Sequence, residues 1–211
     1  MKTILIYGAG GFAREVAWLA EEAGLTVIAF VDDNPKNIGT TINDIQVVSL
    51  ETAQSEFLDV PMVIGVGAPK TRMALATKAR ERGFRFATVI HPQTRMSRWV
   101  SWGEGTIITV GNILTTNIRL GAHVHINLDC TIGHDCILED FVTLAPGVHV
   151  SGWVHIRRCA YIGTGAVIIN GEAGQPIVIG EDAVIGAGAV VTKSIPAGVT
   201  AVGVPARPLE R

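Results

Sequence analysis

The sequence predicts two units of different architecture, an α/β domain with a parallel sheet followed by a parallel β-helix, and two observations lead to this. Strand and helix patterns alternate through residues 2 to about 90 of the 211-residue chain, as expected where helices connect parallel strands. From about residue 96 onward, helical periodicity is nearly absent and aliphatic residues recur every six positions. We place the boundary near His91–Pro92, which gives units of residues 1–92 and 93–211.

The first unit alternates buried strands with helices in a Rossmann-like order. KTILIY predicts the first strand, and the helix that begins in GAGGFA repeats apolar residues on one face until Gly24 ends it. LTVIAFV, DIQVVSL, PMVIGVG and FRFATVI predict the later strands. A short polar helix precedes PMVIGVG, and an amphipathic helix, KTRMALATKARERG, follows it. This order predicts a parallel sheet built from βαβ units.

The second unit repeats an aliphatic residue every six positions. The series is Ile108, Leu114, Leu120, Ile126, Ile132, Leu138, Leu144, Val150, Ile156, Ile162 and Ile168. A small or β-branched residue stands four places after nearly every member, so we expect two inward side chains in each hexad. The phase breaks at residues 170–176 and resumes with Ile179, which predicts a protruding loop. A sustained period of this kind indicates a parallel β-helix.

GAGGFA fits the pattern G-x-G-x-x-A between a strand and a helix. In that setting, backbone amides and a helix N-terminus can bind a diphosphate, and Asp32 after the next strand can accept hydrogen bonds from a ribose or base. A ligand-free tight turn and a dinucleotide-dependent dehydrogenase would use similar residues. About 90 residues make only a mononucleotide-binding half, and a solenoid is not a hydride-acceptor domain. A nucleotide-linked sugar therefore fits better.

The hexads IGTGAV and IGAGAV, followed by VTKSIPAG and VGVPAR, resemble those of left-handed β-helix acyltransferases. With GAGGFARE at the front and NLDCTIGHDC in the coil, essentially the whole chain resembles the sialic-acid O-acetyltransferase and bacillosamine N-acetyltransferase group. The resemblance implies a nucleotide-sugar-binding domain followed by a left-handed β-helix that binds acetyl-CoA. It also implies a homotrimer, because that family forms acetyl-CoA sites between neighbouring coils.

His134 and Asp135 are the candidate catalytic pair. Three hexads form one triangular coil in that family, so Gly152, 18 residues on, should lie over His134 on the next rung, with both facing outward. An imidazole beside a glycine backbone offers a proton acceptor and an N–H donor, as acyl transfer requires. We infer that His134 is the general base, Asp135 orients it and the Gly152 N–H holds the oxyanion. The alternative is that His134 is only a turn residue.

The resemblance carries the same three roles and adds further contacts. Asn127 is implied to contact the reacting groups. The implied nucleotide contacts are Gly8, Gly10, Gly11 and Asp32, with Asp33, Gly65 and Gly67 as further candidates. The implied acetyl-CoA contacts are Gly152, Gly186, Ala187, Gly188, Lys193 and Arg207. One departure concerns Thr143, because some relatives carry a second histidine nine residues after the base.

The favoured reaction is acetyl transfer from acetyl-CoA to the amine of a nucleotide-linked 4-amino-sugar, in the synthesis of a surface glycan or polysaccharide. O-acetylation of sialic acid or another sugar is the nearest alternative, and a nucleotide-binding scaffold without activity is a third. The five coil histidines do not reproduce the spacing of the zinc-binding gamma-type carbonic anhydrases, so we expect no metal. Cys130 and Cys136 hold interior positions, which favours direct transfer over an acyl-cysteine.

The composition disfavours several other partners. A net charge of −2 without a lysine or arginine cluster offers no electrostatic surface for nucleic acid or an anionic membrane. No apolar run reaches the roughly 18 residues of a membrane span, and MKTILIYGAGG reaches glycine too soon for a signal-peptide core. We therefore expect a cytoplasmic protein.

Overall fold

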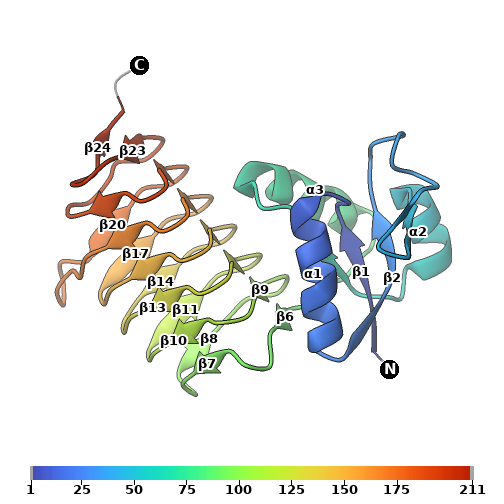
Figure 1. The fold of residues 1–211 in the computed structure, drawn as a ribbon, viewed down its shortest axis with the longest axis horizontal. Coiled ribbons are helices and arrows are strands. Elements are labelled where there is room, and N and C mark those ends of the chain that lie inside the picture. The colour runs from blue at the N-terminus through green and yellow to red at the C-terminus, as the bar shows by residue number, and fades with distance from the viewer. Residues whose placement is uncertain (1, 210–211) are drawn as a thin grey trace.

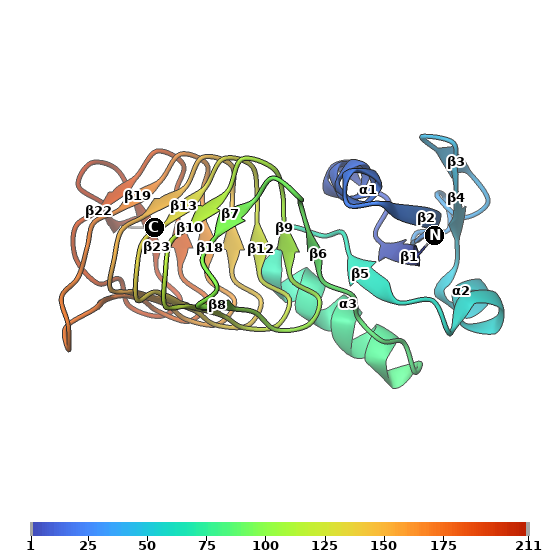
Figure 2. The same cartoon turned by 90° about the horizontal axis from the view of Figure 1, so that it is seen from below.

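The computed structural model describes residues 2–209, which form a small α/β domain beside a long coil of short strands (Figure 1). The α/β domain lies next to the first rungs of the coil (Figures 1 and 2), and the last strands, in residues 200–208, lie at the far end of the coil (Figure 1). No helix among these residues is long and apolar enough to cross a membrane.

The α/β domain contains a five-stranded sheet in the order β3-β4-β2-β1-β5. Its strands are β1 (Lys2–Tyr7), β2 (Leu25–Val31), β3 (Thr41–Ile42), β4 (Ile45–Val48) and β5 (Met62–Ile64). All neighbouring pairs are parallel except β3 and β4, so the predicted parallel sheet carries one antiparallel pair at its edge. The reason is a two-residue turn at Asn43 and Asp44, whose φ angles of 47° and 61° suit a tight hairpin.

Two helices connect these strands, α1 (Gly11–Glu22) and α2 (Leu50–Phe57), and a third, α3 (Pro69–Glu81), leads from β5 to the coil. Helix α1 buries the face that the apolar period predicts, including Val16 and Leu19. Helix α2 begins after Ser49, whose hydroxyl accepts a hydrogen bond from the Thr52 N–H at 3.1 Å, a standard N-cap. Helix α3 begins with Pro69, a residue whose missing N–H costs nothing in a first turn.

The segment FRFATVI does not form the expected strand of the α/β sheet. Phe86 makes a single bridge to Met62, and β6 (Val89–Ile90) instead pairs with β9 of the coil. The last strand read from the first half of the sequence is therefore the first strand of a coil sheet.

The coil has three parallel sheets, each named here after one member. The β12 face contains β6, β9 (Ile107–Ile108), β12 (His125–Ile126), β15 (Thr143–Leu144), β18 (Tyr161–Ile162), β21 (Val184–Ile185), β23 (Thr200–Val202) and the antiparallel β24 (Arg207–Pro208). The β13 face contains β7 (Arg95–Met96), β10 (Ile113–Leu114), β13 (Thr131–Ile132), β16 (His149–Val150), β19 (Val167–Ile168) and β22 (Val190–Val191). The β14 face contains β8 (Val100–Ser101), β11 (Ile118–Leu120), β14 (Ile137–Leu138), β17 (Val154–Ile156) and β20 (Ile177–Ile179).

The coil register agrees with the hexapeptide prediction. Thr131 pairs with His149, which lies 18 residues later, and the aliphatic series is buried in one continuous core. Between β17 and β20 the offset grows to 23, since Val154 pairs with Ile177. The extra residues form the exposed turn within 170–176, so the predicted loop is confirmed.

Turns between faces form the edges of the coil. Residues 127–130, 145–148, 163–166 and 186–189 form the Asn127 edge, between the β12 and β13 faces. Residues 133–136, 151–153 and 169–176 form the His134 edge, between the β13 and β14 faces. The third edge, between the β14 and β12 faces, lies against α3, where Lys70 pairs with Asp182 at 3.1 Å.

Arg72 of α3 joins the two units. Its side chain is 0% exposed and donates from Nε to the His123 carbonyl oxygen at 3.0 Å. From Nη2 it donates to the carbonyl oxygens of Phe141 (2.7 Å) and Val142 (3.2 Å). No carboxylate within residues 2–209 pairs with it. Burial lowers the pKa of Arg72 to about 9, which leaves the guanidinium charged at neutral pH.

Two buried histidines lie at the same junction. The His123 ring stacks on Phe141 with centroids 5.0 Å apart and meets the edge of Phe86 at 4.6 Å. The His125 ring lies 5.3 Å from that of Phe12 of α1. Burial lowers the pKa of His123 to about 4 and that of His125 well below its usual value, so both rings are neutral at pH 7.

We predict that acid weakens this junction. Because the pKa of His123 falls from 6.5 unfolded to about 4 folded, the unfolded chain binds more protons between these values and stability falls as pH falls. His123→Phe should remove roughly 2 to 3 kcal/mol of the loss between pH 7 and 4.5, measured as the free energy of unfolding in urea. His149→Phe, at an exposed position, should keep the wild-type loss. Identical pH dependence in wild type and His123→Phe would refute this.

Candidate active site

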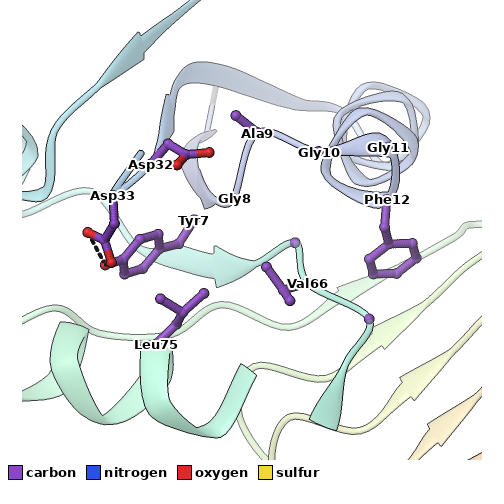
Figure 3. A pocket seen from close by; sticks show the side chains of 12 residues that line it. Tyr7, Gly8, Ala9, Gly10, Gly11, Phe12, Asp32, Asp33, Val66 and Leu75 are labelled. Carbon is purple, nitrogen blue, oxygen red and sulfur yellow. Dashed lines mark hydrogen bonds between the residues drawn. The ribbon is translucent and has the colours of Figure 1, made fainter. Parts of the chain in front are cut away.

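A cavity of about 340 Å³ lies where the carboxyl ends of β1, β2 and β5 meet the start of α1, and we call it the α1 pocket (Figure 3). Its lining includes all the nucleotide contacts expected from the sequence: Gly8, Gly10, Gly11, Asp32, Asp33, Gly65 and Gly67. It also includes Tyr7, Phe12 and Leu75, which sequence reasoning missed. The structure therefore brings the expected set together.

The glycines of this pocket differ in whether the fold itself requires a residue without a side chain. Gly8 has φ +115°, and a Cβ there would lie 3.0 Å from Val66 Cγ2, so the backbone itself requires glycine. A Cβ at Gly10 or Gly67 would meet nothing within 4 Å, so packing does not require glycine there. Helix α1 begins at Gly11 without a side-chain cap, which leaves its first N–H groups available to an anion.

The two aspartates after β2 already form hydrogen bonds within the protein. Both Asp33 carboxylate oxygens accept from the Tyr7 hydroxyl, at 2.9 and 2.8 Å, and Lys78 Nζ lies 2.8 Å from Oδ1. Burial and the Asp33 carboxylate raise the pKa of Tyr7, which keeps the phenol protonated. Asp32 Oδ1 accepts from the Asn34 N–H at 2.7 Å and shapes the following turn. A ligand would meet carboxylates that are held in place.

A second cavity of about 210 Å³, the coil pocket, lies between α1 and the β12 face. Its lining includes Glu15, His125, Asn127, Thr143 and Tyr161. Phe12 and Gly67 line both this cavity and the α1 pocket. In Figure 3 the Phe12 ring points away from the aspartates, toward the coil. A ligand that fills the α1 pocket could therefore extend along Gly67 into the coil pocket.

His134 and Asp135 form a hydrogen-bonded pair on the His134 edge. His134 Nδ1 lies 2.8 Å from Asp135 Oδ2, and Asn117 Nδ2 donates to Asp135 Oδ1 at 3.1 Å. The pKa of Asp135 is lowered, first by the hydrogen bond from His134 and also by that from Asn117. Because a carboxylate only accepts, Nδ1 carries a proton, and in the neutral ring Nε2 is left with a free lone pair.

Gly152 lies on the next rung against the imidazole. A Cβ at this position would be 2.6 Å from both Cε1 and Nε2 of His134, so only glycine lets the ring lie here. The carbonyl oxygen of Gly152 accepts from the Gly171 N–H at 3.0 Å, whereas its own N–H has no acceptor within residues 2–209. A proton acceptor and an unpaired N–H donor thus lie side by side.

The His134 edge lies across the coil from the α/β domain. Phe12 contacts His125 of the β12 face, Arg72 donates to Thr143 of the same face, and in a three-sided coil the edge between the other two faces is opposite it. His134 accordingly lines neither the α1 pocket nor the coil pocket. The expected acid-base pair and the expected nucleotide contacts are not brought together within one chain.

The expected acetyl-CoA contacts are divided in the same way. Gly152 lies on the His134 edge, and the exposed Lys193 follows β22 of the β13 face. Gly186, Ala187 and Gly188 lie on the Asn127 edge, and Arg207 lies on the exposed β24 at the end of the coil.

Comparison with known proteins gives a consistent family. Residues 3–79 match the model of the PglD N-terminal domain. The GDP-perosamine N-acetyltransferase of Escherichia coli O157:H7 is 35% identical over 213 residues, covering 98% of this chain and 96% of that protein. The chain belongs to the family of sugar acetyltransferases.

Solved structures of this acetyltransferase family agree over the full length. WeeI from Acinetobacter baumannii AYE superposes with a TM-score of 0.91 at 38% identity, covering 99% of this chain and 100% of that one. PerB from Caulobacter crescentus, in complex with CoA and GDP-perosamine, gives 0.90 at 30% identity, with 100% and 98% covered. The fold class predicted from the sequence is confirmed.

Two of the cysteines of this acetyltransferase, Cys130 and Cys136, are buried inside the coil. Burial raises the pKa of Cys130 and of Cys136 to about 11, so both thiols are protonated at neutral pH. The Cys136 Sγ donates to the Ser151 carbonyl oxygen at 3.1 Å inside the coil. Within residues 2–209, no group of three or more histidine, cysteine, aspartate or glutamate side chains could hold a metal ion.

We predict that the partners of Asp135 control its ionisation. Because the hydrogen bond from His134 is the largest cause of its lowered pKa, His134→Ala should raise that pKa more than Asn117→Ala does. Carboxyl ¹³C NMR titration of the folded variants would measure this. Asn112→Ala, whose amide bonds only backbone atoms, is the control and should leave the Asp135 titration in place. An equal Asp135 titration in all four proteins would contradict the prediction.

Proposed function

We propose that this protein transfers the acetyl group of acetyl-CoA to the amine of a nucleotide-linked 4-amino-sugar, for a surface glycan or polysaccharide. The observation that carries the proposal is the His134 edge, where a free imidazole Nε2 lies against the glycine backbone of Gly152. The relatives support the substrate class, since one is a GDP-perosamine N-acetyltransferase and another holds CoA and GDP-perosamine.

His134 is the general base of the proposed reaction. As the amine attacks the thioester carbonyl carbon, Nε2 accepts a proton from the nitrogen, and Asp135 stabilises the resulting imidazolium through Nδ1. The Gly152 N–H donates to the developing oxyanion. Collapse of the intermediate breaks the C–S bond, and the CoA thiolate leaves and takes up a proton.

The α1 pocket binds the nucleotide of the proposed substrate. The uncapped N-terminus of α1 and the open side of Gly10 suit the diphosphate. Asp32 and Asp33 lie at the end of β2, where a ribose or base would reach them. The sugar then follows Gly67 into the coil pocket, where Asn127 and other polar side chains would contact its hydroxyl groups.

A homotrimer completes the proposed site. Since His134 lies across the coil from the α1 pocket, the sugar bound by one chain meets the base of a neighbouring chain. Trp99 and Trp102, on either side of β8, and Ile113 of the β13 face are 57%, 44% and 44% exposed, as expected of surfaces that other copies cover. The CoA contacts, divided between two edges, would likewise come from two chains.

The two units would divide the work accordingly. Residues 1–92 bind the nucleotide, and residues 93–211 bind acetyl-CoA and provide the base. Gly152 and Lys193 would act with Gly186, Ala187 and Gly188 of a neighbour, and Arg207 would contact a CoA phosphate.

CoA release with a panel of nucleotide-linked amino-sugars and free sialic acids tests the reaction. We expect turnover on an amino-sugar nucleotide, and we expect His134→Ala to lower kcat by about 10²- to 10⁴-fold while the protein stays folded. His149→Ala is the matched control, because His149 is also exposed and lies one rung further on β16. Turnover on sialic acids alone would indicate O-acetylation. Full activity of His134→Ala would show that His134 is not the general base.

Mixed trimers test whether the site lies between chains. Gly10→Val should block the diphosphate site without a clash, since a Cβ at this position meets nothing within 4 Å. Co-expression of inactive Gly10→Val and inactive His134→Ala chains should restore part of the activity, because some interfaces then combine an intact α1 pocket with an intact base. If the purified mixed trimers remain inactive, each chain uses its own base.

A further inference from the structure

We propose that Thr143 is a positioning residue which, together with Arg72, holds the loop between β5 and α3 at the distance from the coil that acetyl transfer requires. The inference rests on the proposed function, because it concerns how the sugar passes from the α1 pocket to the coil pocket. Gly67 is the critical point of this loop, since it lines both cavities.

The Thr143 hydroxyl connects three elements through one atom. Its Oγ1 donates to the Gly67 carbonyl oxygen at 2.8 Å and accepts from Arg72 Nη2 at 2.9 Å. Thr143 lies on β15 and is 5% exposed, so these hydrogen bonds are shielded from water. The coil thereby holds the wall of the nucleotide pocket directly.

Arg72 holds the same loop from the other side. Its Nη1 donates to the carbonyl oxygens of Val66 at 3.0 Å and Gly67 at 2.9 Å. Its remaining donors bond coil carbonyls, so a shift of the loop would strain hydrogen bonds in both units. The Gly67 oxygen accepts from two donors, and both lone pairs are satisfied.

The support matters because the N–H groups of Val66 and Gly67 donate no hydrogen bond within residues 2–209. Gly65 N donates to the Tyr7 carbonyl oxygen at 2.8 Å and continues the sheet, whereas Gly67 has no Cβ to pack. A displacement of about 1 Å at a substrate-positioning group can cost roughly 100-fold in rate. Holding the Gly67 carbonyl therefore fixes the direction in which the sugar leaves the α1 pocket.

This role accounts for a threonine nine residues after His134, where some relatives carry a second histidine. A hydroxyl oxygen on a short side chain can donate one hydrogen bond and accept another. A position between a carbonyl oxygen, which accepts, and a guanidinium, which donates, requires both. In this chain the position holds the nucleotide-binding loop, and its hydroxyl is taken up by protein partners.

Thr143→Val, which keeps the shape and removes the hydroxyl, tests the proposal beside Thr143→Ser, which keeps the hydroxyl. Thr106→Val is the control, because Thr106 is also buried and its hydroxyl donates to the Gly121 carbonyl oxygen within the coil. We expect Thr143→Val to raise KM for the amino-sugar nucleotide about tenfold and to leave KM for acetyl-CoA within about twofold. Thr143→Ser should restore the first KM.

Hydrogen exchange of the amides of residues 64–70 provides a readout that does not depend on turnover. It should quicken in Thr143→Val and stay at the wild-type rate in Thr143→Ser and Thr106→Val. Failure of wild type to acetylate any amino-sugar nucleotide would refute the proposed function, and the exchange comparison would then decide the role of Thr143 alone. Unchanged exchange in Thr143→Val, an equal rise of both KM values, or a serine variant as impaired as the valine would overturn the inference.

Discussion

The position of the α/β domain relative to the coil depends on the buried guanidinium of Arg72. Removing such a charge from water costs several kcal/mol, and no carboxylate within residues 2–209 offsets that cost. Five backbone carbonyls and the Thr143 hydroxyl do so instead. Hydrogen bonds to a charged group contribute about 1.5 to 3 kcal/mol each, so losing one acceptor is expensive. Two of these acceptors belong to the loop of the α1 pocket and the others to the coil. Arg72 therefore fixes the α1 pocket in one position relative to the coil.

Periodicity made most of the coil predictable, and Arg72 shows where periodicity fails. A six-residue aliphatic repeat reports directly on a side chain that must face inward, so interior, register and loop 170–176 could all be read from the sequence. The positions of His134 and Gly152 follow from the same count. Arg72, by contrast, lies in a helix where an arginine predicts a solvated face. Its burial depends on carbonyls about 50 to 70 residues away, and no local pattern encodes them.

The other differences between the predicted and the observed structure also arise from features that a local sequence pattern does not encode. The β3–β4 hairpin departs from the parallel pattern because Asn43 and Asp44 adopt left-handed backbone conformations, a local choice that a strand-length pattern does not register. Val89 and Ile90 look like any buried strand, and only the presence of a coil sheet with a free edge decides that they pair there. Sequence reasoning expected the proposed nucleotide contacts to lie together because the carboxyl ends of parallel strands meet at one edge, and these residues do line one pocket. Sequence reasoning could not place these residues relative to His134, because the contacts of Arg72 determine how the α/β domain packs against the coil.

Coil geometry then constrains how the proposed chemistry is arranged. With 18 residues in each turn of the coil, two residues nine apart lie half a turn apart, on opposite sides. Thr143 lies on the β12 face with the α/β domain, and His134 lies on the opposite edge. These two side chains therefore cannot serve one reaction within a single chain. A ring of parallel coils removes the difficulty, because the edge of each chain can meet the β12 side of the next. The half-turn spacing that separates the proposed nucleotide site from the proposed base in one chain is thus what would allow a closed trimer, as proposed, to join them.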